Sequence, residues 1–463
     1  MDLDRQQYPH VYLLGIGGIG MSAVARYFQW EGRRVGGYDR TYTPLTSDLQ
    51  REGIFVTYSE GPDAIPSRFL NPATTLIVYT PAIPPSHPQW QFFQEHGFRM
   101  VKRSDVLGWL SSRYPTVGIA GTHGKTSTSA WLGYLLDRLE IPILALVGGI
   151  MNNYRRNIIL PPMGVEPRFF VVEADEYDRT FLKIRHRWAV INSLDPDHLD
   201  IYGTPAAFRA AFESFASATE KVVALAEHTI SELGHIPKPA HITFGKGNGW
   251  DYSYRWMAPN VLAIDRGQKL WFTTRMPLPG NYNAQNLTGA VAILDQMLNV
   301  EDSHRLIKAI ENYRGVWRRF SRIEGVPFEW IDDYAHLPAE IEAALSAMRS
   351  IYPHRKIVAV FHPHLYSRTR DFASDFAQAL TKADEVWILP IYPARETPIP
   401  GVVSELIAHQ MPTNFPCEVI SKRELFRRLT QRPPQVLITL GAGDVDLMIP
   451  EVVRYYAQVK GNR

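Results

Sequence analysis

The stretch GIAGTHGKTSTSAWLGYLLD, residues 118–137, indicates the fold more directly than any other part of the sequence. A short apolar run leads into a glycine-rich turn, and the turn leads into a segment of helical character. Lys125 and Thr126 stand where the helix begins, so amides and the lysine can hold phosphates while the hydroxyl ligates Mg²⁺. The loop is shorter than the common G-x-x-x-x-G-K-[ST] pattern, because Ile119 replaces its first glycine. A plain glycine turn would need neither side chain, so we expect a nucleoside triphosphate site.

A second glycine loop, GIGGIG at residues 15–20, lies near the start of the chain. It fits G-x-G-x-x-G between an apolar strand and a helix, where bare backbone lets a diphosphate approach the helix N-terminus. Asp39 lies 19 residues beyond Gly20, where an acid can bind ribose. Taken alone, the loop indicates a dinucleotide-dependent dehydrogenase, and a turn without a ligand would look the same. Diphosphate binding is favoured because strand, helix and acid agree.

Acidic residues follow another buried run of the same expected domain. EADEYD, residues 173–178, comes directly after the apolar letters FFVV, and carboxylate oxygens are the ligands that Mg²⁺ prefers. Alternation along a strand would put Glu173 and Asp175 on the same side. His198, in the sequence DPDH, follows a further strand among acids, which favours a ligand role over a solvated histidine.

Two histidines and two arginines gather in FHPHLYSRTR, residues 361–370. His362 and His364 share one face of an extended segment. Arg368 and Arg370 follow them, and arginines near a strand end suit carboxylate capture, although exposed arginines are more often merely solvated.

The composition describes a globular chain of several domains. Its 463 residues exceed one ordinary core, and 45% of them are hydrophobic. The net charge of +2 gives no general case for binding nucleic acid or an acidic membrane. The single cysteine, Cys417, excludes an intrachain disulfide and a four-cysteine metal site. We see no signal segment or apolar run of membrane length, so we expect a cytoplasmic enzyme without nucleic-acid or membrane partners.

Alternating strand-like and helical runs predict an α/β fold divided into three domains, at residues 1–112, 113–322 and 323–463. The last of these contains four strand-like runs, FEWIDDYAH, KIVAVFHPH, EVWILPIY and PQVLITLGAG, with helical stretches between them. Active groups in such sheets collect at the carboxyl ends of the strands, which is where the acids and histidines above occur.

The motifs together resemble the Mur ligases, ATP-dependent amide-forming enzymes of peptidoglycan assembly. GIGGIGMSA, GTHGKTST, EADEYD, DPDHLDIYG, GNYNAQN, GVWRRF, DDYAHLP, PHLYSRTR and YPARETPIPG occur in the family's order over nearly the whole chain. The resemblance implies an N-terminal Rossmann-like domain for a UDP-sugar, a central P-loop-type ATPase sheet, and a C-terminal Rossmann-like domain for the incoming amino acid and part of ATP. The first glycine loop would then hold a UDP-sugar diphosphate instead of NAD.

The resemblance also implies a role for individual residues. The UDP moiety would be met by Gly17, Gly18, Ile19, Gly20 and Met21, with Asp39 near its ribose or base. ATP would be held by Gly121, Thr122, His123, Gly124, Lys125, Thr126 and Ser127. Beyond the loop, Asn283 and Asn286 would read adenine, Arg319 would reach the γ-phosphate, and Asp333, or less plausibly Asp332, would bind ribose. Magnesium ligands would be Thr126, Glu173 and His198. The substrate side would include Asp175, Glu176, His336, His364 and Arg368, with Lys125, His198, Arg319 and His364 as the catalytic set.

The implied reaction joins L-alanine to the carboxylate of UDP-N-acetylmuramate through an acyl phosphate, with ATP and Mg²⁺ as cofactors. Cations are needed because two anions must meet before phosphoryl transfer. The alternative is a recycling ligase that adds a whole tripeptide to the same sugar nucleotide. A dehydrogenase would leave Lys125, Glu173 and the asparagine pair unexplained. A non-catalytic UDP-sugar sensor that kept the fold is the third alternative, and the intact Lys125, Glu173 and His198 argue against it. We expect a monomer or a weak homodimer.

Three positions depart from the family pattern. Tyr282 stands where a histidine often precedes the first asparagine, and Leu337 replaces the second histidine of an HHP form. Leu365 replaces an arginine next to the expected amino acid carboxylate. Residues 199–220 contain no lysine, so we do not expect the carbamylated lysine that some Mur ligases use.

Overall fold

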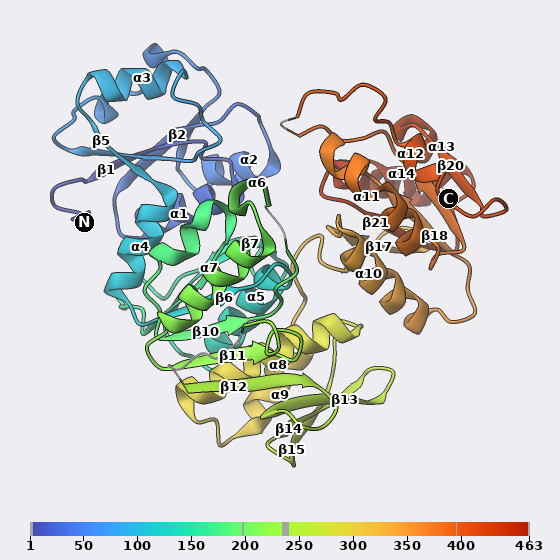
Figure 1. Cartoon of the computed structure of the whole chain (residues 1–463). Coiled ribbons are helices and arrows are strands. Elements are labelled where there is room, and N and C mark those ends of the chain that lie inside the picture. The colour runs from blue at the N-terminus through green and yellow to red at the C-terminus, as the bar shows by residue number, and fades with distance from the viewer. Residues whose placement is uncertain (1–2, 197–198, 234–239, 395, 462–463) are drawn as a thin grey trace. The chain divides into compact units, whose positions relative to one another are not determined.

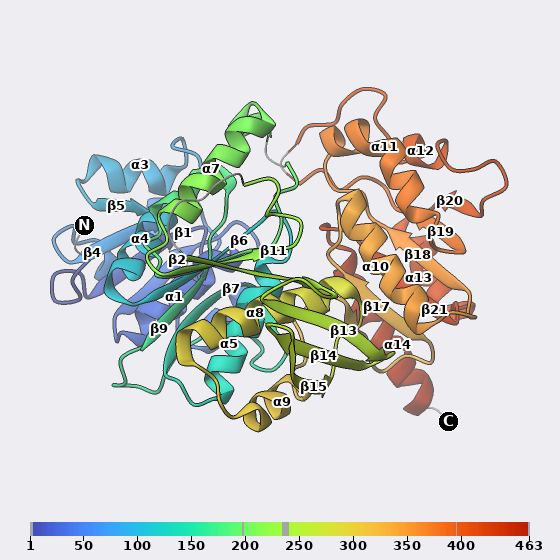
Figure 2. The same ribbon diagram turned by 60° about the horizontal axis from the view of Figure 1, so that its bottom comes forward.

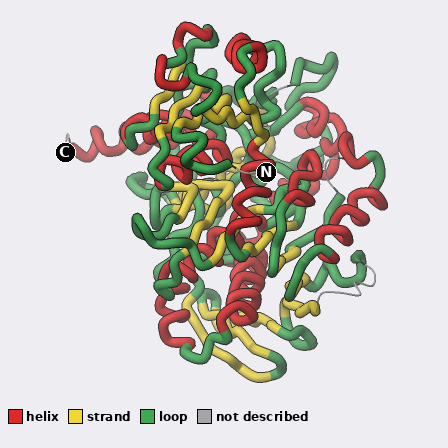
Figure 3. The backbone as a smooth tube through the Cα atoms, turned by 90° about the vertical axis from the view of Figure 1, so that its left-hand side faces the viewer, coloured by secondary structure: helices red, strands yellow, loops and turns green. Residues whose placement is uncertain are grey.

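The structure is a computed structural model that describes residues 3–196, 199–233, 240–394 and 396–461 (Figure 1). The described chain is rich in both helices and strands, which Figure 3 colours red and yellow. The strands form three separate sheets of five, ten and six strands. The expected α/β class with three sheet-based domains is therefore confirmed.

The first sheet is entirely parallel, in the order β3-β2-β1-β4-β5. The strand order reverses beside β1, and ligands of open α/β sheets bind at such a point. Its strands are β1 His10–Leu14, β2 Arg34–Tyr38, β3 Phe55–Thr57, β4 Thr75–Tyr79 and β5 Arg99–Lys102. Its helices are α1 Ile19–Trp30, α2 Pro44–Arg51, α3 Pro88–Glu95 and α4 Arg103–Arg113, with short 3-10 helices η1 Pro62–Ala64 and η2 Ser67–Phe69.

The second sheet runs β15-β14-β13-β12-β11-β10-β6-β9-β7-β8, and β6 lies between β9 and β10. Every residue of β6 is buried, which explains its continuous apolar and small-residue sequence TVGIA. The strands are β6 Thr116–Ala120, β7 Ile143–Met151, β8 Arg156–Ile159, β9 Phe169–Glu173, β10 Trp188–Ile191, β11 Val222–Ala226, β12 Ala240–Lys246, β13 Tyr252–Ala258, β14 Val261–Arg266 and β15 Lys269–Arg275. The helices are α5 Lys125–Arg138, η3 Tyr177–Lys183, α6 Leu199–Tyr202, α7 Pro205–Ser217, α8 Asn281–Leu298 and α9 Ser303–Glu311 (Figure 2).

The third sheet has the order β16-β17-β21-β18-β19-β20, parallel except for β16. The four predicted runs are its strands β17 Glu329–Asp333, β18 Ile357–Phe361, β19 Glu385–Ile388 and β21 Val436–Leu440. Two short edge strands, β16 Ser321–Arg322 and β20 Cys417–Val419, were not predicted. The helices are α10 Pro338–Ile351, α11 Tyr366–Leu380, α12 Glu405–Ala408, α13 Lys422–Gln431, η4 Val445–Met448 and α14 Ile449–Gly461.

The chain forms two compact units. The first comprises 1–255, 262–275 and 285–314, and the second comprises 256–261, 276–284 and 315–463. The first two sheets share the first unit, and one buried apolar cluster extends from Leu3 to Leu233. Hydrogen bonds also join them: Arg26 of α1 donates to the buried Asn157 Oδ1 at 2.6 Å, and the half-buried Trp30 Nε1 donates to the Pro161 carbonyl at 3.0 Å. In the described ranges, no helix combines the length and apolar character needed to cross a membrane.

Candidate active site

The loop between β6 and α5 has a backbone that its glycines make possible. Gly121 has φ +126° and Gly124 has φ +80°, conformations that other residues rarely adopt. A Cβ on Gly121 would lie 2.9 Å from the Ser193 nitrogen, and one on Gly124 would lie 2.4 Å from Asn286 Oδ1. Both glycines are therefore required by conformation and by space.

The segment that follows β10 holds this loop in place. Ser193 accepts the Thr122 amide through its carbonyl at 3.3 Å and the His123 amide through its hydroxyl at 2.8 Å. The Thr122 hydroxyl donates to the Asp195 carbonyl at 2.6 Å. Because β10 is the parallel neighbour of β6, its carboxyl end reaches the loop directly. The loop is thus held by contacts between the segments that follow two neighbouring strands, β6 and β10.

Lys125 opens α5 and is the best-connected cation of the loop. Its Nζ lies 2.8 Å from both carboxylate oxygens of Glu176 and 2.7 Å from the Gly121 carbonyl. Burial alone would lower the pKa of Lys125, but Glu176 and then Asp175 outweigh it and the pKa is raised. Burial raises the pKa of Glu176, against the opposing effect of Lys125. The lysine is therefore charged, and Glu176 occupies the position of an anionic partner.

Glu173, the last residue of β9, faces the first turn of α5. One of its oxygens is 3.2 Å from the Thr126 hydroxyl, and the other accepts the Ser129 hydroxyl at 3.1 Å and the Gly148 amide. A Cβ on Gly148 would lie 2.5 Å from the carboxylate, so glycine there lets Glu173 approach. Thr126 and Glu173, which were both predicted as magnesium ligands, therefore lie next to each other.

Asp175 does not share a strand face with Glu173, because β9 ends at Glu173. That expectation was wrong: Asp175 lies beyond the strand, and its Oδ1 accepts the Tyr177 amide at 3.1 Å at the start of η3. His198 lies outside the described residues. Across the described ranges, no cluster of three or more His, Cys, Asp or Glu side chains is arranged to hold a metal ion. One carboxylate and one hydroxyl still fit Mg²⁺, which keeps several waters and binds phosphate oxygens.

The first glycine loop lies between β1 and α1, at the switch point of its sheet. Gly15 has φ +85°, and the Gly17 amide donates to Asp39 Oδ2 at 2.8 Å. A Cβ on Gly17 would lie 2.8 Å from that oxygen. Asp39 therefore shapes the loop, and its other oxygen accepts the Thr41 amide at 3.2 Å. Gly18 is the N-cap of α1, Ile19 and Gly20 are its first two residues, and Met21 is buried in its first turn.

Arg103 is a cation at this loop that the sequence did not reveal. A Cβ on Gly20 would lie 2.6 Å from Arg103 Nη1, so the guanidinium lies against the start of α1. It comes from the first residue of α4, far along the chain. A guanidinium beside a helix N-terminus adds to the attraction for a diphosphate.

Two adjacent arginines of the second unit have different environments. Arg318 is buried, and its side chain donates to Asp332 at 3.1 Å and to the Gly443 carbonyl at 2.6 Å. Arg319 is only half-buried and lies 5.0 Å over the Tyr334 ring. Arg318 and Asp332 therefore have structural partners, which leaves Arg319 as the candidate for phosphate.

Asp333 ends β17 and is the remaining ribose candidate. Its two oxygens accept the backbone amides of Phe320 at 2.7 Å and Ala335 at 2.8 Å. Burial raises the pKa of Asp333 to about 6, although Arg319 opposes the rise.

The two predicted adenine readers lie one turn apart on α8, in different compact units. Asn286 is buried in the first unit, where its Oδ1 accepts the Thr128 hydroxyl at 3.3 Å. Asn283 is buried in the second and donates to the Pro279 carbonyl at 2.7 Å. Tyr282, at the position that departs from the family, is half-buried, and its hydroxyl oxygen is itself shielded from solvent.

The predicted amino acid residues converge in the second unit. The rings of His336 and His364 are 6.0 Å apart, and an Arg368 nitrogen lies 3.5 Å from His364 Nδ1. Burial lowers the pKa of His336, although Glu340 opposes this. Leu365 adopts φ +73°, rare for a leucine, immediately before α11. Arg370 instead points to Asp371 at the surface.

Several residues of the site carried no recognisable signal in the sequence. Asn192 donates to the Thr128 hydroxyl at 2.9 Å, and Ser193, Ser129, Gly148 and Arg103 make the contacts described above. Only Asn192 and Ser193 carried a hint, since they follow a buried strand and precede DPDH. The others depend on which elements the fold brings together.

Family models match three consecutive parts of the chain. They are described as Mur ligase family, catalytic domain, at residues 10–115; Mur ligase middle domain, at residues 119–294; and Mur ligase, glutamate ligase domain, at residues 318–443. Between them the three models cover both glycine loops, His336 and His364.

Curated relatives and solved structures agree with these models. UDP-N-acetylmuramate–L-alanine ligase of Cytophaga hutchinsonii is 40% identical, over 96% of this chain and 96% of its own length. The enzyme of that name from Flavobacterium johnsoniae is 39% identical, over 97% and 98%. The crystal structure of UDP-N-acetylmuramate-alanine ligase MurC from Thermotoga maritima has a TM-score of 0.81 at 26% identity, over 97% of this chain and 99% of its own. The chain belongs to the Mur ligase family.

Proposed function

We propose that this protein is an ATP-dependent carboxylate–amine ligase that joins L-alanine to the carboxylate of UDP-N-acetylmuramate, with release of ADP and phosphate. The observation that carries the proposal is the loop of residues 121–126. There Lys125 and Thr126 open a helix opposite Glu173, in a chain about 40% identical to ligases named for this reaction. The muropeptide-recycling reaction, in which a tripeptide replaces L-alanine, is the alternative.

The charges of the loop suit phosphoryl transfer to a carboxylate. Lys125 is preorganised by Glu176 and the Gly121 carbonyl, and incoming phosphate oxygens would take over contacts that Glu176 now makes. The amides of the loop and the lysine would then offset the repulsion between ATP and the acceptor carboxylate. Arg319, the half-buried arginine of the second unit, is proposed as a further cation for the γ-phosphate.

Magnesium is proposed as the metal cofactor, held by Thr126 and Glu173, with His198 serving a second ion on the acceptor side. The ion would neutralise charge on the phosphates during transfer. Thr126 and Glu173 are already oriented toward each other at 3.2 Å, and Ser129 with Gly148 fixes the carboxylate. These donors restrict the rotation of Glu173, so less ordering is needed when a metal binds.

The reaction proceeds in two steps, phosphoryl transfer and amide formation. The γ-phosphoryl group moves to the sugar carboxylate with cleavage of the β–γ bond, and the alanine nitrogen then attacks the acyl carbon. A proton leaves the nitrogen, and phosphate departs as the amide forms. We propose that Arg368 binds the alanine carboxylate, because it is half-buried beside His364 while Arg370 is paired at the surface.

The test is a reconstituted reaction with UDP-N-acetylmuramate, ATP and Mg²⁺, in which L-alanine and the tripeptide are supplied separately. We expect ADP release and a product heavier by one alanyl group with L-alanine, and a far slower reaction with the tripeptide. Faster reaction with the tripeptide would assign the recycling function instead. ADP release without either product would exclude both.

A further inference from the structure

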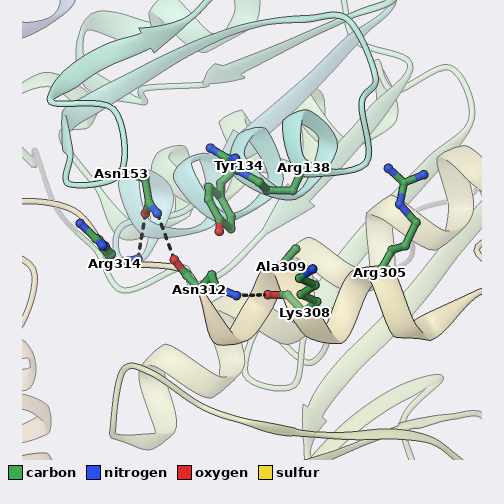
Figure 4. Close-up of a pocket in the computed structure, with 8 residues that line it drawn as sticks. All are labelled: Tyr134, Arg138, Asn153, Arg305, Lys308, Ala309, Asn312 and Arg314. Carbon is green, nitrogen blue, oxygen red and sulfur yellow. Dashed lines mark hydrogen bonds between the residues drawn. The ribbon is translucent and has the colours of Figure 1, made fainter.

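A pocket with a volume of about 680 Å³ lies at the end of α5 that is remote from the phosphate loop (Figure 4). Its walls come from the last turns of α5, the turn after β7, one face of α9 and the residue that follows Tyr313. It is lined by Tyr134, Arg138, Asn153, Arg305, Lys308, Ala309, Asn312 and Arg314. All of these residues belong to the first compact unit. α5 has 14 residues, so roughly 20 Å separates the pocket from Lys125.

The lining carries four cations and no acid. Arg305 is paired with Glu140 at 2.9 Å and Arg138 approaches Asp137 at 3.7 Å, but these carboxylates lie outside the lining. Within the described part of the chain, Lys308 and Arg314 form no ion pair. The whole chain has a net charge of only +2, so the cations are concentrated here.

A second pocket of the same unit provides a contrast. Its volume is about 580 Å³, and its cations Arg5 and Arg113 share the lining with Asp4, Glu31 and Glu166. Arg113 is bonded to Glu31 at 2.8 Å. A cavity of similar size is thus balanced in charge, whereas the one at the end of α5 is not.

Hydrogen bonds fix the walls of the basic pocket in advance. The Asn153 amide donates to the Asn312 carbonyl at 3.0 Å, and its oxygen accepts the Arg314 amide at 2.8 Å. Asn312 in turn donates to the Lys308 carbonyl at 2.8 Å, closing the end of α9. Asn153 of the opposite wall therefore holds the backbone of Asn312 and Arg314, while Asn312 closes the last turn of its own helix at Lys308, as the dashed lines of Figure 4 show.

The floor between the cations is small and partly aromatic. Positions 305, 308, 309 and 312 share one face of α9, and Ala309 in their midst leaves open space. Arg138 lies across the buried Tyr134, with its guanidinium carbon 5.3 Å from the ring centre (Figure 4). This stacking restrains the guanidinium, whose planar donors match phosphate oxygens.

We propose that this pocket binds a small ligand that carries at least two phosphate groups, at a site separate from the two nucleotide sites of the ligase. The volume lies in the range of small-molecule sites. Four cations, from two helices and the segment after them, suit an anion of high charge. A lining without carboxylates offers nothing that would bind a cationic ligand. The proposal does not rest on the ligase activity and would survive its failure.

The probe is inorganic tripolyphosphate, titrated calorimetrically into protein carrying Lys125→Ala so that the phosphate loop does not compete. The pocket variant adds Lys308→Glu and Arg314→Glu, and the matched control adds Arg209→Glu and Lys269→Glu, two exposed cations elsewhere in the unit. We expect the pocket variant to bind at least tenfold more weakly, the control to bind unchanged, and affinity to fall with added salt. Fructose 1,6-bisphosphate, titrated in parallel, distinguishes an organic bisphosphate from an inorganic chain.

Loss of either probe's binding in the pocket variant alone supports the site. Equal binding by the pocket variant and its parent, equal losses in the pocket and control variants, or no binding of either probe to the parent would each overturn it. Thermal unfolding of each variant checks that the fold is retained, which we expect because Lys308 and Arg314 are exposed.

Discussion

The first compact unit contains two glycine loops that share a backbone plan and differ in their side chains. Each follows a strand that has a parallel neighbour on both sides and opens a helix, β1 into α1 and β6 into α5. The first is closed by Asp39, which binds the Gly17 amide, and α1 begins with Ile19. In the second, α5 begins with Lys125 and Thr126, which meet Glu176 and Glu173.

Under the proposed function, the difference indicates which features of each loop would select its ligand. Both loops offer amides at a helix N-terminus, so both suit an anion. Only the second loop combines a lysine with a hydroxyl and a carboxylate that suit a metal ion. Transfer of a phosphoryl group requires such charge neutralisation, whereas binding a diphosphate that stays intact does not. The predictions below test this separation of roles.

Lys125→Ala should have the largest effect. Removing the half-buried Lys125 cation from the phosphates should slow amide formation by about a thousandfold or more, roughly 4 kcal/mol of barrier. The Glu176 carboxyl left behind would then take up a proton, since burial already raises its pKa. Steady-state kinetics with all three substrates measures the effect, and near-normal turnover would show that this loop is not the ATP cradle.

Glu173→Gln should be next, with turnover reduced by about a hundredfold and a higher Mg²⁺ requirement, because the amide keeps the shape and loses the charge. Ser129→Ala is the matched control, since it removes one hydrogen bond to Glu173 and leaves the charge. It should cost about tenfold or less. Equal effects of the two changes on the Mg²⁺ dependence would argue against a metal role for Glu173.

Gly17→Ala should weaken UDP-N-acetylmuramate binding by about tenfold, because the added carbon would displace Asp39 and overpacking costs about 1–3 kcal/mol. ATP affinity should be retained. Gly18→Ala is the control for space, since the nearest atom to its Cβ would be 3.4 Å away. A larger loss of thermal stability in the Gly18 variant than in the Gly17 variant would contradict the packing argument.

The smallest effect concerns Asp333, which tests whether nucleotide recognition extends beyond the loop. Its raised pKa of about 6 means that the carboxyl is neutral below that pH. If the ionised form accepts ATP ribose hydroxyls, the KM for ATP should rise a few-fold as the pH falls from 7 to 5. Asp333→Asn should weaken the pH dependence of the KM for ATP. Only the part that comes from protonation of ATP itself should remain. An unchanged profile in the variant would remove Asp333 from the nucleotide site.

The sequence predicted the α/β class, the four principal strands of the third sheet and the position of each glycine loop between a strand and a helix, because these signals are local. Apolar runs, glycines and the lysine at a helix start lie within a few positions of one another. The edge strands β16 and β20 were missed because strands of two and three residues have too little pattern of their own.

The partners of the predicted residues could not be read from the sequence. Gly148 meets Glu173 because β7 pairs with β9, and Arg103 meets Gly20 because α4 begins beside α1. Such contacts follow from tertiary packing, which propensity and spacing do not encode. The shared strand face proposed for Glu173 and Asp175 failed for a related reason, since a strand end is among the least certain features of a sequence reading.

The division of labour between the loops is tested most directly by calorimetric titration of Lys125→Ala and Gly17→Ala with UDP-N-acetylmuramate and with a non-hydrolysable ATP analogue. We predict a crossed result, in which Lys125→Ala loses affinity for the ATP analogue alone and Gly17→Ala loses affinity for the UDP-sugar alone. Loss of UDP-sugar binding in Lys125→Ala, or of ATP-analogue binding in Gly17→Ala to the same degree, would contradict the assignment of the two loops.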